Sequence, residues 1–598
     1  MKQKSRTNRP GKPAQAAGVI AGLALCFSLN ASAQTPEDQK LDSFFRHYLD
    51  EEFEQQPLQA TALGDHRFDQ RLDDISATAR GRWLALTKTT LRQLPRAVKY
   101  RDLSRDGQID YDIFRHNLET DIWETKNFHP FEDDPRTYGA YLDDSVYLLL
   151  TQSTLPAETN IANCIARMAQ FPRIIAEAEK TLAHPPQPIL ETAIRQNRGA
   201  IDFYQKDIFQ YAGDTAQREQ LKASAAATAV LLEGYQQFLE GPLRARATGE
   251  WRIGKRRFDK KFELETDAGV TAEQNRADAQ EEFDRVRRDM FVIARQLWCQ
   301  YFPDKPMPPD DALGERETIL KVIDAIDQDH DRADELVPAA RAAVERIKDF
   351  IRRRNYLPLP EPDQCQVIVM PEFRRGNSLA YLDNAPPLDP RAHSYYAVSP
   401  PPADWTPQEV ETFLQEYNRY MLQILTIHEG YPGHYVQLAY ANRTPSLIRR
   451  VYQSGSYVEG WAVYGEMTML NEGYGNGDLR LRLMELKFYL RAVANSILDY
   501  QMHCTGMTDA EAMKFLTQDA FQSEGEAKLK LIRAKQSSVQ LSTYFVGRMA
   551  HYRLHQEVER EMGDRFNLSD YHRAVISHGS IPPKYLPELV RRDLGLTP

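Results

Sequence analysis

A helical hydrophobic period runs through most of this chain and constrains its fold more than any other feature. Apolar residues recur every three or four positions with charged residues opposite them, as in segments 278–298 and 333–355. Such stripes bury one face of each helix against neighbouring helices. Strand-like segments are few, and the clearest are 366–373 and 394–400. The sequence therefore predicts a mainly α protein with a small strand-and-loop insert.

Proline clusters mark the connections between helical segments. The densest cluster lies at 357–402 and divides the chain into an N-terminal helical region, 34–356, and a second region, 357–598. A chain of 598 residues with 42% hydrophobic residues has enough apolar surface for a large core. One large unit or two to three modules are both compatible with this length.

The first 33 residues have the pattern of a secretion signal. A basic start precedes a short apolar run at 16–29, and the small residues 31–33 fit a cleavage site. This run is shorter than the roughly 20 residues that a membrane-spanning helix needs. We expect an exported protein, periplasmic or secreted, without a transmembrane segment. Lipid anchoring at Cys26 is the less favoured alternative, because the preceding Leu25 is bulky where a small residue is expected.

The charge balance excludes several classes of partner. Without the signal segment the chain has 70 basic and 85 acidic residues, a net charge of −15, which disfavours nucleic acid and anionic membranes. The basic run at 252–261 is interpreted as a solvated face. Four cysteines remain and none forms a C-x-x-C pair, so a cysteine-rich metal site is excluded, whereas one or two disulfides remain possible. These cysteines are Cys164, Cys299, Cys365 and Cys504.

The segment HEGYPGH at 428–434 resembles the zinc-binding pattern H-E-x-x-H, with the second histidine two residues late. Upstream, Thr406 is placed to cap a helix that has proline at its first position and glutamate three residues after the cap. The apolar spacing carries this predicted helix through to His428 on its buried stripe. The charged Glu429 beside that stripe needs a partner, and a metal ion supplies one.

The six-residue spacing rules out a regular helix as the chelating unit. Residues six apart on a helix lie about 240° apart, so His428 and His434 would face away from each other. Gly430, Pro432 and Gly433 disfavour a regular helix in any case. We therefore expect a looped-out turn that returns His434 to the side of His428, as bulges at functional sites do.

A third ligand is predicted in the helical segment 454–470. Glu459 follows His434 by 25 residues and shares a helical face with Val463 and Glu466. Two histidines and a glutamate hold a zinc ion (Zn2+) with one position left for water. The alternative is that Glu459 is an ordinary surface acid; its proximity to the HEGYPGH motif favours the ligand.

HEGYPGH together with YVEGWAVYGE at 457–466 resembles the domain-of-unknown-function 885 family, which is grouped with the glutamate-zincin metallopeptidases. Segments 379–389, 395–401, 533–548 and 579–586 also look like parts of this family, so the likeness covers most of the mature chain. The resemblance implies one domain with a mostly helical fold around a deep cleft. It supports the metal site more firmly than the activity, because most members have no assigned substrate.

The sequence departs from many glutamate-zincins at one position. Four residues after the third ligand, where an acidic residue is usual, this chain has Val463. Support for the zinc ligands is therefore expected from Glu466 or Asp499.

The ligand set predicts hydrolysis of peptide bonds. Zinc held by His428, His434 and Glu459 would lower the pKa of its bound water and polarise a substrate carbonyl. Glu429 would then act as the general base and pass the proton to the leaving amine.

Further candidates lie on a predicted helix at about 536–560 and in the insert. Tyr544 is our choice of donor to the oxyanion, with a half-buried core tyrosine as the alternative. Arg548 is either a clamp for a substrate carboxylate or a surface arginine. His551 and His555 are poorer metal candidates, because no glutamate adjoins them. Tyr381 and Tyr396 are expected to line the substrate groove.

Two other functions remain open. One is a zinc hydrolase of a non-peptide amide, such as an acyl amino acid or a cell-wall fragment. The other is a helical binding protein without turnover, which the presence of Glu429 disfavours. No G-x-S-x-G elbow, P-loop or dinucleotide fingerprint occurs in the sequence.

Overall fold

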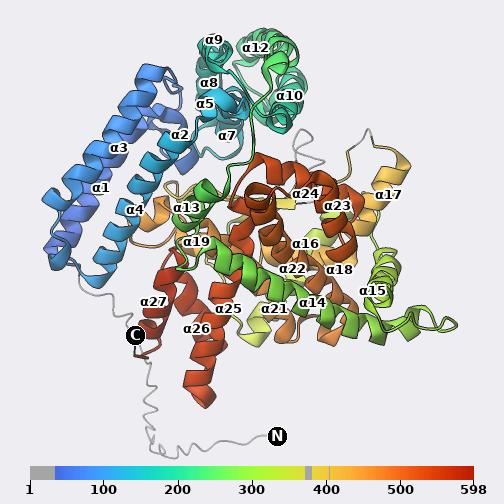
Figure 1. Cartoon of the computed structure of the whole chain (residues 1–598). Coiled ribbons are helices and arrows are strands. Elements are labelled where there is room, and N and C mark those ends of the chain that lie inside the picture. Colours follow the sequence, from blue (N-terminus) through green and yellow to red (C-terminus); the bar gives the residue numbers. More distant parts are fainter. Residues whose placement is uncertain (1–33, 371–379, 403–404, 598) are drawn as a thin grey trace, which may run out of the picture.

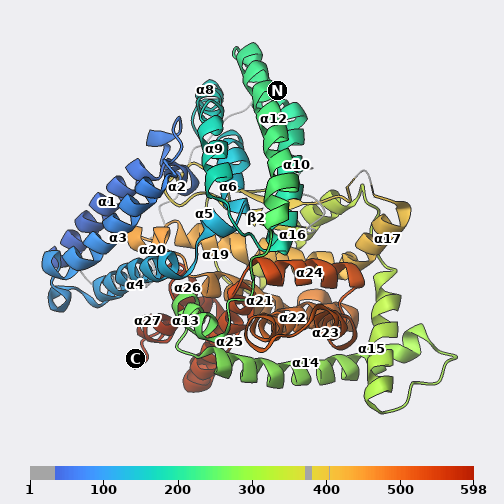
Figure 2. The same cartoon turned by 45° about the horizontal axis from the view of Figure 1, so that its top comes forward.

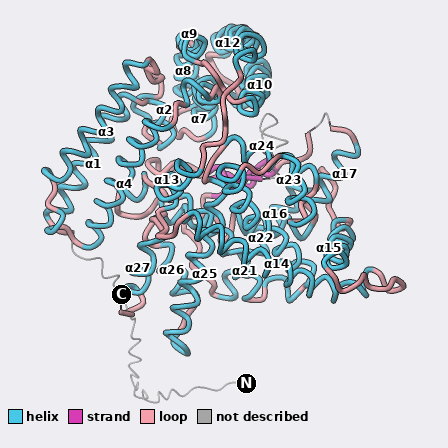
Figure 3. The backbone as a smooth tube through the Cα atoms, viewed as in Figure 1, coloured by secondary structure: helices cyan, strands magenta, loops and turns pink. Residues whose placement is uncertain are grey.

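The computed structural model describes residues 34–370, 380–402 and 405–597, so the predicted signal segment 1–33 and Cys26 lie outside the described residues. Helices dominate the described chain (Figures 1 and 3), which confirms the mainly α prediction. The strands are β1 (Cys365–Val369), β2 (Ala380–Asp383) and β3 (Ser394–Val398). They fall within the predicted insert.

The N-terminal helices form an elongated arm at one side of the molecule (Figure 1). This arm consists of α1 (Pro36–Gln55), α3 (Ala77–Ala97) and α4 (Arg105–Asn127). Within the arm, Phe45 of α1 contacts Phe114 of α4 at a ring-centroid distance of 4.8 Å. Phe45 also contacts Tyr452 of the body at 5.6 Å. The arm therefore shares its apolar core with the rest of the chain.

A second group of helices forms a bundle with its own core, seen at the top of Figures 1 and 2. Buried side chains such as Phe171, Tyr204 and Leu232 fill this core. The helices of the bundle are α7 (Ser145–Thr151), α8 (Ala157–Met168), α9 (Phe171–Thr181), α10 (Gln187–Asp202) and α12 (Arg218–Phe238).

The largest core joins the arm to the long helices of the body and draws residues from both sides of position 356. The predicted helical segment 278–298 lies in α14, and α16 covers 336–354 of the predicted segment 333–355. The body helices are α14 (Ala272–Tyr301), α15 (Ala312–Asp327), α16 (Leu336–Arg354), α18 (Arg419–Glu429), α21 (Gly455–Asn471), α22 (Leu479–Tyr500) and α25 (Thr543–Met562). The other α-helices are α2 (Pro57–Leu63), α5 (Pro130–Asp133), α6 (Arg136–Gly139), α11 (Ile208–Ala212), α13 (Lys255–Thr266), α17 (Pro407–Glu416), α19 (His434–Ala441), α20 (Leu447–Val451), α23 (Asp509–Lys514), α24 (Glu524–Gln536), α26 (Leu568–Ile576) and α27 (Leu586–Asp593).

The three strands form one small sheet in the order β1-β3-β2, with β1 parallel and β2 antiparallel to β3. The predicted strands 366–373 and 394–400 correspond to β1 and β3, although 371–373 lie outside the described residues. The sequence prediction missed β2. The sheet is tied to α18, because the hydroxyls of Tyr396 on β3 and Thr426 on α18 lie 3.1 Å apart in a hydrogen bond.

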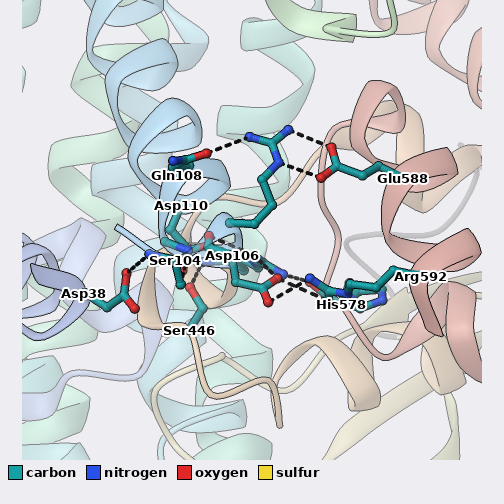
Figure 4. A network of polar contacts seen from close by, with 12 residues as sticks. Asp38, Ser104, Asp106, Gln108, Asp110, Ser446, His578, Glu588 and Arg592 are labelled. Atoms are coloured by element: carbon teal, nitrogen blue, oxygen red, sulfur yellow. Dashed lines mark hydrogen bonds and ion pairs between the residues drawn. The ribbon is translucent and has the colours of Figure 1, made fainter. Parts of the chain in front are cut away.

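A charged network links the arm to the C-terminal helix (Figure 4). The buried Arg449 lies 2.5 Å from Asp110 and 3.2 Å from Asp106, both on α4. Asp106 also pairs with Arg592 of α27 at 3.0 Å. Arg449 of α20 and the shared carboxylate of Asp106 therefore hold α4, α20 and α27 together.

The structure also bears on the predicted disulfides and on the predicted lack of a transmembrane segment. The four described cysteines are free thiols, so no disulfide links them. Within residues 34–370, 380–402 and 405–597, no helix combines the length and the apolar character that crossing a membrane requires.

Candidate metal centre

The helix that carries the first histidine is broken once. Thr406 forms the predicted capping box with Glu409 at the start of α17. The prediction of one continuous helix to His428 is wrong, because the chain leaves helical geometry at Tyr417. The side chain of Asn418 then caps α18 by accepting from two backbone N–H groups, at 3.0 Å each. His428 lies in the last turn of α18 and is 5% exposed, as its place on the apolar stripe predicts.

The segment between the two histidines is a turn that joins two helices, where a bulge inside one helix was predicted. α18 ends at Glu429 and α19 begins at His434. The N–H of Gly433 donates to the carbonyl of Ile427 at 3.0 Å, and a Cβ at Gly433 would collide with the carbonyl oxygen of His428. Only glycine allows this close approach. The turn places the rings of His428 and His434 4.6 Å apart, as the predicted looped-out segment requires.

Glu459 comes from α21, which begins at the Ser454 cap and covers the predicted helical segment. Its Oε2 lies 3.7 Å from Nε2 of His428 and 3.5 Å from Nε2 of His434. Donors bound tetrahedrally at about 2.1 Å from zinc lie roughly 3.4 Å from one another. The three side chains thus have the spacing of a zinc site.

Two buried polar atoms of this cluster have no hydrogen-bond partner among the described residues. Oε2 of Glu459 and Nδ1 of His434 are buried without a hydrogen bond, a costly arrangement for a charged oxygen. A cation bound among the three side chains removes that cost. Within the described residues, His428, His434 and Glu459 are the one group of three or more histidine, cysteine or acidic side chains that fits a metal ion.

Glu466 orients the first histidine. Its Oε1 lies 2.5 Å from Nδ1 of His428, which leaves Nε2 directed at Glu459. Carboxylate–histidine pairs of this kind fix the ring tautomer at metal sites. Many glutamate-zincins have an acidic residue at the position of Val463. Here Glu466, one of the two residues predicted to support the zinc ligands, lies one turn later and contacts His428. The other, Asp499, instead accepts hydrogen bonds from Val539 N and the Ser542 hydroxyl.

The side chains of His428, Glu459 and Glu466 shift one another's pKa values. Burial disfavours the imidazolium of His428, but Glu459 and Glu466 outweigh burial and raise its pKa well above the ordinary value. Burial opposes ionisation of Glu459, yet the two histidines lower its pKa. Burial raises the pKa of Glu466 to about 7. Strongly shifted pKa values gathered in one place are typical of functional sites.

Glu429, the predicted base, ends α18 next to His428 and is half-buried. Its Oε2 accepts a hydrogen bond of 3.0 Å from the backbone N–H of Leu382 in β2. Burial raises the pKa of Glu429, with Glu459 adding to the shift and the two histidines opposing it. The small sheet therefore serves to fix this carboxylate beside the ligands.

Tyr544 lies in the first turn of α25, a helix that starts at Thr543 and so begins later than predicted. The side chain is half-buried, and its hydroxyl oxygen accepts a hydrogen bond of 2.9 Å from Arg533. Burial, reinforced by the charge of Glu459, raises the pKa of Tyr544 to about 12. The tyrosine thus stays protonated at neutral pH, with its own proton available to a further acceptor.

Two predicted substrate contacts are corrected by burial. Arg548 is 3% exposed and pairs with Glu282 at 3.3 Å, with its guanidinium 4.2 Å from the ring centroid of Tyr489. It is therefore neither a surface arginine nor an available clamp. Tyr396 is fully buried against α18 and lines no groove. Tyr381 is half-buried on β2, and its role stays a prediction.

His551 and His555 belong to a separate cluster without a carboxylate at its centre. The hydroxyl of Tyr464 lies 2.7 Å from Nδ1 of His555 and 2.8 Å from Nε2 of His572. Nε2 of His551 is 3.3 Å from the carbonyl oxygen of Tyr457. These contacts are those of a hydrogen-bonded core.

Two side chains near the centre were not predicted from the sequence. The ring of Phe488 on α22 lies 5.7 Å from that of His428 and closes one side of the cluster. Arg533, the partner of Tyr544, lay within a segment that was already singled out, but nothing in its spacing showed the contact. Two cavities of the described structure are lined by other residues and include none of the three candidate ligands.

The fold and the centre together define a mainly helical protein in which two buried histidines and a half-buried glutamate converge, with a second glutamate beside them. The chain belongs to the family described as "Bacterial protein of unknown function (DUF885)", whose model matches residues 57–590. This match confirms the resemblance to the domain-of-unknown-function 885 family.

Two solved structures are similar over nearly the whole chain. "The structure of a putative lipoprotein of unknown function from Shewanella oneidensis" is 30% identical with a TM-score of 0.76, covering 91% of this chain and 98% of the other. "The crystal structure of the putative lipoprotein from Colwellia psychrerythraea" is 17% identical with a TM-score of 0.77, covering 94% and 99%; at this identity it supports the fold alone. A search of curated proteins gave no match.

Proposed function

We propose that this protein is an exported zinc-dependent metallopeptidase. The observation that carries the proposal is the convergence of His428, His434 and Glu459 at zinc-ligand spacing, with a buried Glu459 oxygen that has no hydrogen bond. Glu429 adjoins this cluster and has its own backbone donor. A ligand set with an adjacent carboxylate is the requirement for metal-assisted hydrolysis.

The residues divide the reaction between them. His428, His434 and Glu459 would hold the zinc ion, which supplies Lewis acidity toward a carbonyl and makes water more acidic. Glu429 accepts a proton from the attacking water and passes it to the leaving amine. The protonated Tyr544 donates to the oxygen on which negative charge develops. Glu466 keeps Nδ1 of His428 occupied, so that Nε2 faces the ion.

Export is part of the proposal. Residues 1–33 have the composition of a secretion signal, and the similar structure from Shewanella oneidensis, at 30% identity, is described as a putative lipoprotein. This description supports export. Lipidation of Cys26 and cleavage after residue 33 are both compatible with it.

The decisive experiment compares wild-type protein with Glu429→Gln. Pools of short peptides are digested and read by mass spectrometry, and the zinc content of both proteins is measured. We expect about one zinc per chain in both, and at least about a 100-fold loss of cleavage in the variant, as for removal of a general base. Glu557→Gln, which changes an exposed glutamate on α25, serves as the control with unchanged cleavage.

The outcomes separate the alternatives. Cleavage that persists in Glu429→Gln would contradict the assigned base. Protein without zinc after growth with added zinc would contradict the metal site. Zinc-bound protein that leaves every peptide intact would point to a non-peptide amide or to a binding function.

A further inference from the structure

A group of three basic side chains lies beside the metal centre. Lys530 and Arg533 are three residues apart on α24 and so share one face of that helix. Arg491 comes from α22, the helix that also carries Phe488. We call Arg491, Lys530 and Arg533 the cationic cluster.

An acid beside the cluster, Glu526, already has partners for both of its oxygens. Glu526 lies one turn before Lys530, and its Oε1 accepts a hydrogen bond of 2.7 Å from the hydroxyl of Tyr417. Its Oε2 pairs with Arg491 at 3.0 Å. Neither Lys530 nor Arg533 has a carboxylate within ion-pair distance among the described residues. The cluster therefore carries more positive than negative charge.

Lys530 is the member that most needs a partner. Its side chain is 4% exposed, and no described side chain hydrogen-bonds to it. Burial, with the charges of Arg491 and Arg533, lowers the pKa of Lys530 well below its ordinary value, while Glu526 and Glu459 oppose the shift. A buried ammonium without a counterion is costly, and an anion brought against it favours the charged form. Among the described residues, no carboxylate lies within ion-pair distance of Lys530, so an added anion would find this ammonium without a direct partner there.

Several contacts join the cluster to the metal centre. The ring of Phe488 lies 5.7 Å from that of His428 on one side and 5.6 Å from the guanidinium of Arg491 on the other. Arg533 donates to the hydroxyl of Tyr544, at 2.9 Å. The charge of Glu459 affects both Lys530 and Tyr544. An anion held by the cluster is thus within a short peptide's length of the candidate ligands.

We propose that the cationic cluster binds the C-terminal carboxylate of a short peptide, so that the protein cleaves peptides near their C-terminus. Ammonium and guanidinium groups are the donors that hold carboxylates most strongly in proteins. Lys530 and Arg533 receive the carboxylate, and Arg491, held by Glu526, adds to the positive field. This inference rests on the proposed peptidase function and specifies its substrate class.

The test compares matched pools of short peptides that differ only in having a free or an amidated C-terminus. Wild-type protein should cleave the free-acid pool at least about tenfold faster, as the loss of one charged hydrogen bond implies. Lys530→Gln should lower cleavage of the free-acid pool to the level of the amidated pool and leave the amidated pool unchanged. Lys528→Gln, on the same helix but exposed and paired with Glu524 at 2.7 Å, should behave as wild type.

A binding readout separates this inference from the proposed function. The Glu429→Gln protein is filtered with each pool, and the retained peptides are identified by mass spectrometry. Preferential retention of free-acid peptides, lost on adding Lys530→Gln, supports the cluster even if the wild type cleaves nothing. Equal retention and equal cleavage of the two pools would overturn the inference while leaving the peptidase proposal intact.

Two further controls test the position of the bound carboxylate and the folding of the variant. Amidated peptides with an aspartate or glutamate near the end distinguish a side-chain carboxylate from the terminal one; retention of these at the level of the free acids would overturn the assignment to the C-terminus. Lys530→Met removes the charge and keeps the bulk, so it should fold with an unchanged or higher melting temperature. Its loss of free-acid preference therefore reports on binding and not on misfolding.

Discussion

Helix α21 separates two groups of histidines that differ in their neighbours. One face of the helix carries Glu459 and Glu466, which contact His428 and His434. The opposite face carries Tyr464, whose hydroxyl contacts His555 and His572. Residues five positions apart on a helix lie about 140° apart, so Glu459 and Tyr464 cannot serve the same group.

The two groups differ in the carboxylates that adjoin the histidines, and this difference changes the histidine pKa values. Glu459 and Glu466 raise the pKa of His428 despite its burial. Burial alone dominates the other group and lowers the pKa of His551 and His555 to about 4 and of His572 to about 3. Neutral, hydrogen-bonded histidines form a core, whereas histidines facing a buried anion are suited to a cation. Histidine spacing is therefore a weaker indicator of a metal site than the acids nearby.

The largest expected difference between the two groups is in metal content. Substituting a ligand, as in Glu459→Gln or His434→Ala, should reduce bound zinc from about one per chain to less than about a tenth. The cause is the loss of one of only three protein ligands. Metal analysis of purified protein after dialysis measures this directly.

The matched control is His555→Gln, which changes the other group. It should keep zinc at the wild-type level, because no atom of His555 contacts a candidate ligand in the described structure. Loss of zinc in His555→Gln, or full zinc in Glu459→Gln, would remove the distinction between the two faces of α21.

A smaller effect is expected at the residue behind the ligands. Glu466→Gln keeps the shape of the side chain but removes its charge from Nδ1 of His428, and zinc affinity should fall about 10–100-fold. Competition with a chromogenic chelator measures this affinity. Glu472→Gln is the matched control, because Glu472 caps the same helix and pairs at the surface with Arg354. A reduction in both variants would indicate a general effect on α21.

Much of this arrangement was accessible from the sequence, and for local reasons. Helical periodicity predicted the mainly α fold, because an apolar stripe is recognised from the spacing of residues within its own segment. Gly430, Pro432 and Gly433 predicted that the chain turns between the histidines, since their backbone preferences are intrinsic. Glu459 followed from its helical placement and its distance from His434.

What the sequence did not predict depends on long-range contacts. The break at Tyr417 and Asn418 interrupts a stripe whose apolar spacing continues across it, and only the Asn418 cap marks it. The sequence around Arg548 is compatible with a surface arginine. In the structure, Glu282, which lies 266 residues earlier, pairs with Arg548 in the core. Lys530 lies in a helix with many charged residues, where a lysine is usually exposed. Its burial depends on the packing of α24 against other helices, which the local sequence does not show.

The smallest expected effect is a pH dependence of stability that arises from the core histidines. In the unfolded chain a histidine has a pKa of about 6.5, whereas that of His572 in the folded protein is about 3. Between these values the unfolded state binds more protons, so stability rises with pH and is lost as pH falls below 6.5. From pH 7 to pH 5 this costs about 2 kcal/mol for His572.

The measurement is the melting temperature at pH 7 and pH 5, in the presence of a chelator so that the metal centre is empty throughout. His572→Gln should show a smaller decrease between the two pH values than the wild type, because one proton-binding group of the unfolded state is gone. His47→Gln, which replaces a histidine that is 74% exposed on α1, should decrease as the wild type does. Equal decreases in all three proteins would mean that His572 is charged in the folded core, and the division of α21 into a cation-binding face and a neutral face would no longer hold.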